Sequence, residues 1–129
     1  MKRMLTAGLA LMLTASIALG HCQVPCGIYG DQLRFQQMLE DEDTIAKAQV
    51  QINEFAKAGP SAQGVNQVAR WVMAKEQHAQ KIQDTIAAYF MAQRIKADNP
   101  NYIKQLTAAH KVMVAAMKCK QSADPETAE

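Results

Sequence analysis

The chain has 129 residues, which suits one compact domain and leaves little room for two. It is 49% hydrophobic but only 5% aromatic, and its Lys and Arg residues nearly balance its Asp and Glu residues, for a net charge of +2. No basic stretch is interleaved with aromatic residues, so we expect no nucleic-acid partner. Ala, Gln, Lys, Met and Leu dominate the middle of the chain, and these residues favour α-helices.

The first 20 residues have the pattern of a secretory signal peptide. Lys2 and Arg3 provide a short positive segment, and residues 4–19 are then apolar or small and carry no charge. A membrane-spanning helix needs about 20 apolar residues, so this shorter run is better suited to a leader that is removed. The alternative is a retained anchor helix at the N-terminus.

The end of this leader determines the chemistry of the mature chain. Ala18 and Gly20 place small residues at the two positions that a signal peptidase inspects. Removal of the leader makes His21 the first residue of a mature domain, 21–129, with no membrane attachment. A lipoprotein is disfavoured because His21, which is not a small residue, precedes Cys22. We therefore expect an exported protein, periplasmic or extracellular.

The mature chain is predicted to begin with an irregular segment and to continue in helices. Residues 21–30, which we call the hook, contain Pro25 and two Gly residues that disfavour a helix. Beyond the hook, apolar residues recur three and four positions apart, which is the spacing of one helix face. This spacing predicts three helices, at about 31–58, 62–97 and 101–119.

Capping residues indicate where these helices begin. Asp31 and Ser61 are the expected N-caps of the first two helices, and Asn99 is that of the third, with Pro100 at its first position. Asp124 has the position of a further N-cap near the end of the sequence. We therefore expect an all-α, antiparallel helical bundle of the four-helix type, with its last helix truncated.

The repeating apolar residues predict the core. His110 falls among them, so we expect a core or interface histidine there rather than a ligand, and Cys119 is expected to be a buried residue or free thiol. Methionines at helical spacing are expected to fill the core and interfaces rather than to bind copper: Met38, Met73, Met91, Met113 and Met117. The other expected core positions are Ile45, Ala48, Ile52, Phe55, Val65, Val68, Val72, Ala79, Ile82, Ile86, Tyr89, Ile103 and Leu106.

Metal donors gather at the start of the mature chain, on His21, Cys22 and Cys26. The α-amine of His21 and the amide of Cys22 close a chelate ring with a metal, and the amide and thiolate of Cys22 close another. With the Cys26 thiolate they form a planar set of nitrogens and sulfurs, which suits Cu(II) or Ni(II), whereas Zn(II) prefers a tetrahedron. The His21 imidazole can then approach along the axis. The alternative is a Cys22–Cys26 disulfide, the usual state of paired Cys residues in exported proteins.

The hook resembles the nickel hook of nickel-containing superoxide dismutases, through the string His21-Cys22-x-x-Pro25-Cys26-Gly27-x-Tyr29. A weaker resemblance to the central helix of that family lies at Lys75-Glu76-Gln77 and Tyr89-Phe90. The resemblance implies a four-helix bundle that assembles as a homohexamer, with one nickel ion per chain. It also implies superoxide as the substrate, converted into dioxygen and hydrogen peroxide by Ni(III)/Ni(II) cycling.

The resemblance also assigns roles to individual residues. It makes His21, Cys22 and Cys26 the nickel ligands. It places Tyr29 above the open axial side of the metal, where this catalytic residue positions small molecules and water. Tyr89 is expected to support the site from outside the ligand set.

The chain departs from the family at three positions. Gln23 follows the first Cys of the hook, where the family often has Asp. Gln36 and His78 stand where many members have a Glu and an Arg that support the axial imidazole. Both side chains can still form hydrogen bonds with a His, but the charge pair is lost, so we expect the support of the axial imidazole to depart from that of the family.

Two other functions remain open from the sequence alone. One is an exported metal-binding protein that uses the same donors without turnover, and a bound metal without redox activity would indicate it. The other is a structural helical bundle in which Cys22 and Cys26 form a disulfide, which a count of free thiols would reveal.

Overall fold

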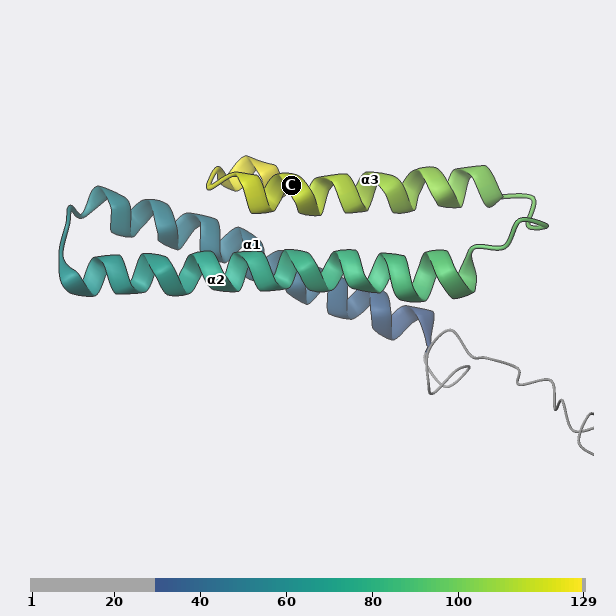
Figure 1. Ribbon diagram of the computed structural model, residues 1–129, viewed down its shortest axis with the longest axis horizontal. Coiled ribbons are helices and arrows are strands. Elements are labelled where there is room, and N and C mark those ends of the chain that lie inside the picture. Colours follow the sequence, from purple (N-terminus) through teal and green to yellow (C-terminus); the bar gives the residue numbers. More distant parts are fainter. Residues whose placement is uncertain (1–29, 129) are drawn as a thin grey trace, which may run out of the picture.

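The structure is a computed structural model that describes residues 30–128, which form helices and loops without a strand (Figure 1). The predicted all-α class is therefore confirmed for this part of the chain. The long helices are α1 (Asp31–Lys57), α2 (Ala62–Asp84) and α3 (Tyr102–Gln121). A π-helix, η1 (Thr85–Arg94), continues α2, and a short 3-10 helix, η2 (Pro125–Ala128), follows α3. The predicted signal peptide and hook residues 21–29 lie outside the described residues.

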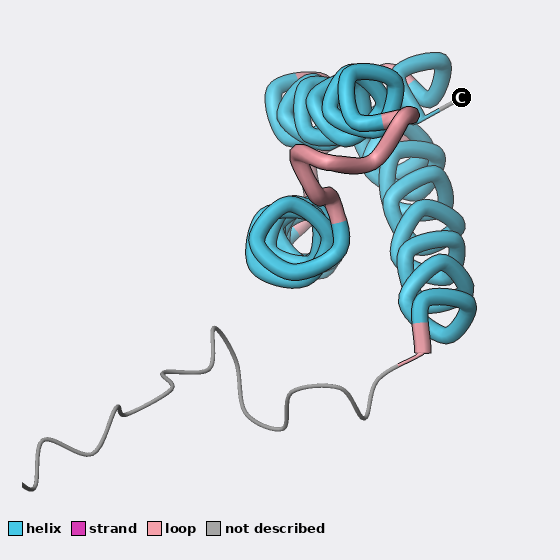
Figure 2. Tube along the Cα trace, turned by 90° about the vertical axis from the view of Figure 1, so that its right-hand side faces the viewer, coloured by secondary structure: helices cyan, strands magenta, loops and turns pink. Residues whose placement is uncertain are grey.

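The helix α2 is the central element of the described bundle, because α1 and α3 both pack on it. Figure 2 looks nearly along α2 and α3 and shows α1 running obliquely beside them. Between α1 and α3 lies an apolar groove of about 850 Å³, whose lining includes Phe35, Leu39 and Val112. Residues 30–128 contain three long helices, so the four-helix part of the prediction is not confirmed.

The turn between α1 and α2 follows the predicted chemistry. Ser61 is the N-cap of α2, and its Oγ accepts a hydrogen bond of 2.9 Å from the Gly64 amide. Gly59 has a φ of +84°, in the left-handed region that Gly adopts without strain. The end of α1 at Lys57 and the start of α2 at Ala62 therefore lie close to the predicted boundaries.

The predicted caps of the first and third helices are wrong. Gly30 is the N-cap of α1, and no side chain caps this end, because the Asp31 carboxylate is engaged in the tertiary contacts described below. Asn101 is the N-cap of α3, so Pro100 lies before the helix rather than at its first position. Asn99 instead stabilises the preceding turn, where its Oδ1 accepts a hydrogen bond of 2.8 Å from the Asn101 amide.

The predicted cap at Asp124 is confirmed, although the helix that it begins is short. The Glu126 amide donates to Asp124 Oδ1 at 3.1 Å, and η2 follows as a single 3-10 turn within the described residues. This turn packs against both α1 and α3.

The second predicted helix, 62–97, is not a continuous α-helix. It widens after Asp84 into the π-helix η1 and ends at Arg94. The Ile95 amide accordingly donates to the Phe90 carbonyl, five residues back, at 2.8 Å. The apolar spacing did not reveal the change from α-helix to π-helix. Ile86 and Tyr89 are buried in the π-helix, as they were predicted to be in a continuous α-helix.

The core is predicted correctly in α1 and around the end of α2, and poorly in α3. Ile103 is 70% exposed and Met117 is 41% exposed, and His110 also lies on the surface, so the core interpretation of these residues is wrong. The buried side chains of α3 are instead small ones, those of Ala109, Ala116 and Cys119. The buried apolar residues are Ile45, Ala48, Ile52, Ala79, Ile82, Ile86, Tyr89, Phe90, Ala109, Ala116 and Cys119.

The beginning of α2 contributes little to this core. Val65 is 63% exposed and Val72 is 37% exposed, contrary to the prediction. Figure 1 shows the reason, since the ends of α1 and α2 that meet at the Gly59 turn extend beyond the end of α3. None of the helices in residues 30–128 is long and apolar enough to span a membrane.

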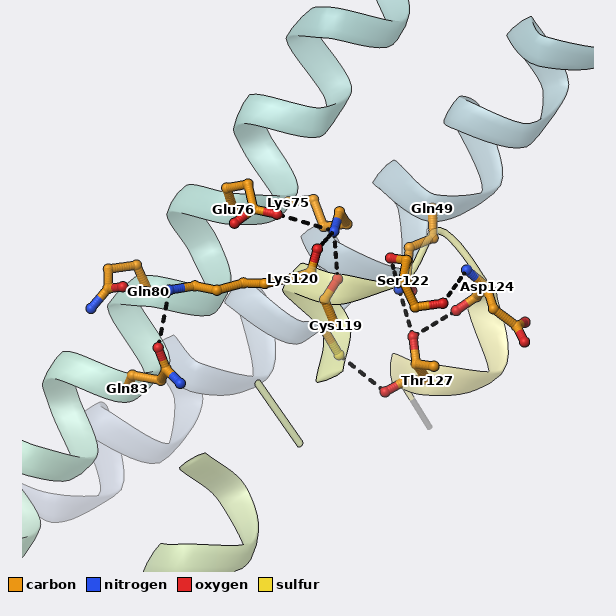
Figure 3. A network of polar contacts seen from close by, with 10 residues as sticks. All are labelled: Gln49, Lys75, Glu76, Gln80, Gln83, Cys119, Lys120, Ser122, Asp124 and Thr127. Atoms are coloured by element: carbon orange, nitrogen blue, oxygen red, sulfur yellow. Dashed lines mark hydrogen bonds and ion pairs between the residues drawn. The ribbon is translucent and has the colours of Figure 1, made fainter. Parts of the chain in front are cut away.

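A buried lysine caps the C-terminal end of α3 (Figure 3). Lys75 of α2 is 4% exposed, and its Nζ donates to the Cys119 carbonyl at 2.6 Å and to the Lys120 carbonyl. Carbonyls in the last turn of a helix have no partner within it and carry the negative end of the helix dipole. The ammonium group therefore satisfies these carbonyls and fastens α3 to α2.

A glutamine makes the corresponding contact from α1. Gln49 is fully buried, and its Nε2 donates to Thr127 Oγ1 at 2.7 Å and to the Ser122 carbonyl at 3.3 Å (Figure 3). Asn53 adds a bond of 2.7 Å to the Ala123 carbonyl. The segment after α3 is thus held to α1 by side-chain amides.

We expect Lys75→Met, which keeps the length of the side chain and removes its donor, to lower the free energy of unfolding by about 1–3 kcal/mol, because buried carbonyls lose their partner. Urea unfolding of the metal-free chain measures this change. Lys47→Met, on the exposed surface of α1, is the matched control and should have little effect. Equal unfolding midpoints for the two variants would contradict the capping role of Lys75.

Candidate functional site

The predicted site residues lie outside the described part of the chain, so their assignment stays a prediction. They are the nickel ligands His21, Cys22 and Cys26 and the catalytic residue Tyr29. Gly30, the last residue of the hook, and Asp31, the first residue of α1, are described. The structure therefore reports on the end of the bundle to which the hook is attached.

Three polar side chains meet at this end, and we call them the hook-root cluster: Asp31, Tyr89 and Arg94. The Tyr89 hydroxyl donates to Asp31 Oδ1 at 2.7 Å, and Arg94 Nε donates to the same oxygen at 2.7 Å. Arg94 Nε also lies 3.1 Å from the Tyr89 hydroxyl, which accepts from it. The cluster thus joins the first residue of α1 to the π-helix η1.

The π-helix accounts for the pairing of Tyr89 with Arg94. In a π-helix, residues five apart lie one above the other, because its hydrogen bonds connect residues i and i+5. The Arg94 guanidinium accordingly lies 5.1 Å from the centre of the Tyr89 ring, within the range of a cation–π contact. In an α-helix, residues five apart point in different directions, so the sequence alone gives no sign of this contact.

Aromatic rings pack against the buried side of the hook-root cluster. Tyr89 is 5% exposed, and its ring meets that of Phe90 edge-on at 5.1 Å. Phe35 of α1 lies 4.9 Å from Phe90 on a tilted plane, and the Arg34 guanidinium lies 5.8 Å from the Tyr89 ring. The Tyr89 ring is therefore held by apolar contacts, while its hydroxyl reaches the polar rim of the bundle.

The electrostatics of the cluster favour a neutral phenol between two charged groups. The hydrogen bond from Tyr89 lowers the pKa of Asp31 below its ordinary 3.8, burial opposes this, and Arg94 adds to the lowering. Burial, and then the bond to Asp31, raise the pKa of Tyr89 above its ordinary 10.0, although Arg94 acts in the opposite direction. Because its pKa is lower in the folded chain, Asp31 contributes stability above pH 3.8, and this contribution is lost as the pH falls through the lowered pKa.

Gln36 and His78 do not bond to each other within the described residues, and their support of the axial imidazole stays a prediction. His78 Nδ1 lies 2.5 Å from Asp41 Oδ1 of α1, and the Lys81 ammonium lies 3.9 Å from the same oxygen. Gln36 is exposed, and its side chain forms no hydrogen bond within residues 30–128. His78 is therefore half-buried and has a carboxylate partner on α1.

Sequence reasoning missed Asp41, although its spacing could have indicated it. Asp41 precedes the buried residues Ile45, Ala48 and Ile52 at helical intervals, so it lies on the face of α1 that packs against α2. A carboxylate on such a face needs a partner, and His78 provides one. The hydrogen bond between Asp41 and His78 thus joins α1 to α2 on this face.

Cys119 is a buried free thiol, as the sequence predicted. Its Sγ donates to the Thr127 carbonyl at 3.0 Å, and burial raises the pKa of the thiol. The expectation for the methionines holds for Met38 and Met113, which pack against the core, and is wrong as a core assignment for Met73 and Met91, which are exposed. The described part of the chain contains no group of three or more His, Cys, Asp or Glu residues that could hold a metal ion.

The fold and the attachment point define a class, a small all-α bundle whose polar end carries an N-terminal segment rich in metal donors. Comparison with known families identifies it more closely, because the model of the nickel-containing superoxide dismutase family matches residues 16–129. The chain therefore belongs to the family of nickel-containing superoxide dismutases, and nickel is its cofactor. No curated protein and no solved structure matches the chain.

We expect a difference titration of tyrosinate absorbance, between the parent protein and Tyr89→Phe, to show that Tyr89 has a pKa above 10.0. Asp31→Asn removes an anion that favours the neutral phenol, so it should lower this pKa. Arg94→Gln removes a cation that favours the phenolate, so it should raise the pKa further. Shifts in the same direction for the two variants, or a pKa of 10.0 or less in the parent, would contradict the described geometry.

Proposed function

We propose that the chain is an exported superoxide dismutase whose nickel is bound by the first residues of the mature protein. The family match supports this proposal, since it spans residues 16–129 and so contains the donor string from His21 to Tyr29. The hook-root cluster supports it further, because it gives the hook a defined and polar point of attachment.

The donors of the hook suit nickel by their chemistry. The thiolates of Cys22 and Cys26 are soft and strongly donating ligands, and the α-amine of His21 and the amide of Cys22 add nitrogen donors. The imidazole of His21 would offer a further nitrogen donor. Nickel held by these groups would supply the one-electron chemistry of the Ni(III)/Ni(II) couple, by which one superoxide anion would be oxidised and the next reduced.

Residues around the metal would position the substrate and deliver its protons. Two superoxide anions and two protons yield one dioxygen and one hydrogen peroxide. Tyr29 positions water and the substrate at the open side of the site, and protons reach the substrate from that water or through the thiolates. Tyr89 supports the site from the bundle, where its hydroxyl donates to Asp31, the residue that follows the hook.

We further propose that the chain is exported by its leader and that the mature protein assembles with copies of itself, as a hexamer by analogy with the family. The groove between α1 and α3 supports the assembly, since Phe35 and Leu39 on its wall are 47% and 62% exposed. Apolar side chains of this size are stabilised by burial against another surface.

The first test is the composition of the exported protein. We expect an intact mass that begins at His21 and about one nickel ion per chain, with X-ray absorption showing sulfur ligands. A chain that retains Gly20, or that is cut after His21, lacks the required amine and would contradict the proposed ligand set. A redox-silent metal would instead support binding without turnover, and a Cys22–Cys26 disulfide in purified protein would support a structural bundle.

The second test separates the roles of the hook residues. Cys22→Ser or Cys26→Ser should abolish superoxide decay measured by pulse radiolysis, because a strongly donating thiolate is lost. Cys119→Ser is the matched control, and it should keep its nickel and its activity. His21→Ala keeps the amine and should retain nickel, but it should lose turnover with the axial imidazole.

Tyr29→Phe deletes only a hydroxyl, so the activity loss should correspond to one hydrogen bond, about 0.5–1.5 kcal/mol, at unchanged nickel content. Loss of nickel in this variant would instead place Tyr29 in the folding of the hook. Full turnover of His21→Ala would refute the axial role of the imidazole.

A further inference from the structure

The first turn of α1 is stabilised in an unusual way. The amides at the start of a helix normally receive a side-chain cap, but Gly30 has no side chain to offer. Asp31, which is placed to interact with the dipole of its own helix, instead directs Oδ1 to donors on η1, both at 2.7 Å. The start of α1 therefore depends on a tertiary contact.

The hook-root cluster is a closed triangle, since each of its members contacts the other two. Its Tyr89 corner is buried, whereas the side chains of Asp31 and Arg94 are 49% and 41% exposed. The two charged groups thus lie at the rim, next to the point where the chain leaves the bundle. Arg94 suits this position because its Nε–H reaches both oxygens while the guanidinium lies over the Tyr89 ring.

We propose that Asp31 and Arg94 are positioning residues for the nickel hook, a proposal that rests on the proposed function. They fix the direction in which the chain leaves α1, and so determine where the hook begins relative to Tyr89. Neither residue contacts the metal in this proposal, and both act through the Tyr89 hydroxyl and the first turn of α1.

The length of the connection makes this control effective. Cys26 is five residues before Asp31, so their Cα atoms are separated by at most about 18 Å. Helix ends fray readily when their amides lack a cap, and fraying of one turn would free roughly four more residues. The connection would then reach almost twice as far. By holding Asp31, the cluster limits the positions that the ligands can occupy.

The experiment uses the mature, nickel-loaded, full-length protein and the variants Asp31→Asn, Arg94→Gln and their combination. Asp43→Asn and Arg70→Gln are matched controls, since both residues are exposed and form no hydrogen bond or ion pair within residues 30–128. The readouts are nickel retention against a chelator, the electron paramagnetic resonance spectrum of oxidised nickel, and urea unfolding of the metal-free chain.

We expect each single variant to retain nickel about tenfold less tightly, with a broadened nickel spectrum, while the controls match the parent. The double variant should be no worse than the poorer single variant, because both residues act in one cluster. Arg94→Lys keeps the charge but lacks the Nε–H, so it should recover at most part of the nickel retention.

The outcomes distinguish this inference from the proposed function. A parent protein without nickel or without turnover refutes the proposed function itself. A loaded, active parent with Asp31→Asn and Arg94→Gln equal to the controls overturns the positioning role. Nickel loss only in proportion to global unfolding of the metal-free variants also overturns it, since the cluster would then act on folding alone.

Discussion

The hydrogen bond from the Tyr89 hydroxyl to the Asp31 carboxylate connects residues 58 positions apart and determines how one end of the bundle closes. The aromatic ring lies among apolar residues, which fixes the hydroxyl at the rim, and the carboxylate then holds the start of α1 against η1. Arg94 completes this arrangement only because the π-helix places it above the ring. Asp31 follows the hook directly in the chain, so this bond holds the residue next to the proposed site.

The other end of the bundle is closed by different chemistry. Lys75 of α2 satisfies the last carbonyls of α3, and Gln49 of α1 holds the segment that follows. Between the two polar ends, an apolar groove separates α1 from α3, and both helices pack against α2. Polar contacts thus determine the arrangement of the helix ends, whereas apolar burial supplies the non-directional attraction between the helices.

A helical bundle with a separate donor segment suits a protein whose proposed substrate is a small anion. Superoxide needs no shaped pocket, so the helices can serve as a platform while the donors reside in a short segment at the N-terminus. The family match joins the platform and the donor string in one unit, residues 16–129. The Asp41–His78 pair adds a polar contact between α1 and α2 within this platform.

The sequence by itself determined the helical class, most of the helix boundaries, the Ser61 cap, the buried face of α1 and the family. These features depend on local spacing and on residue chemistry, which a single chain displays directly. The tertiary structure alone decided that Asp31 bonds to Tyr89 instead of capping its helix, that α2 widens into a π-helix, and that small residues of α3 face the core. The reason is physical: a polar side chain takes the partner that packing brings within hydrogen-bonding distance, and packing depends on how the helix faces meet.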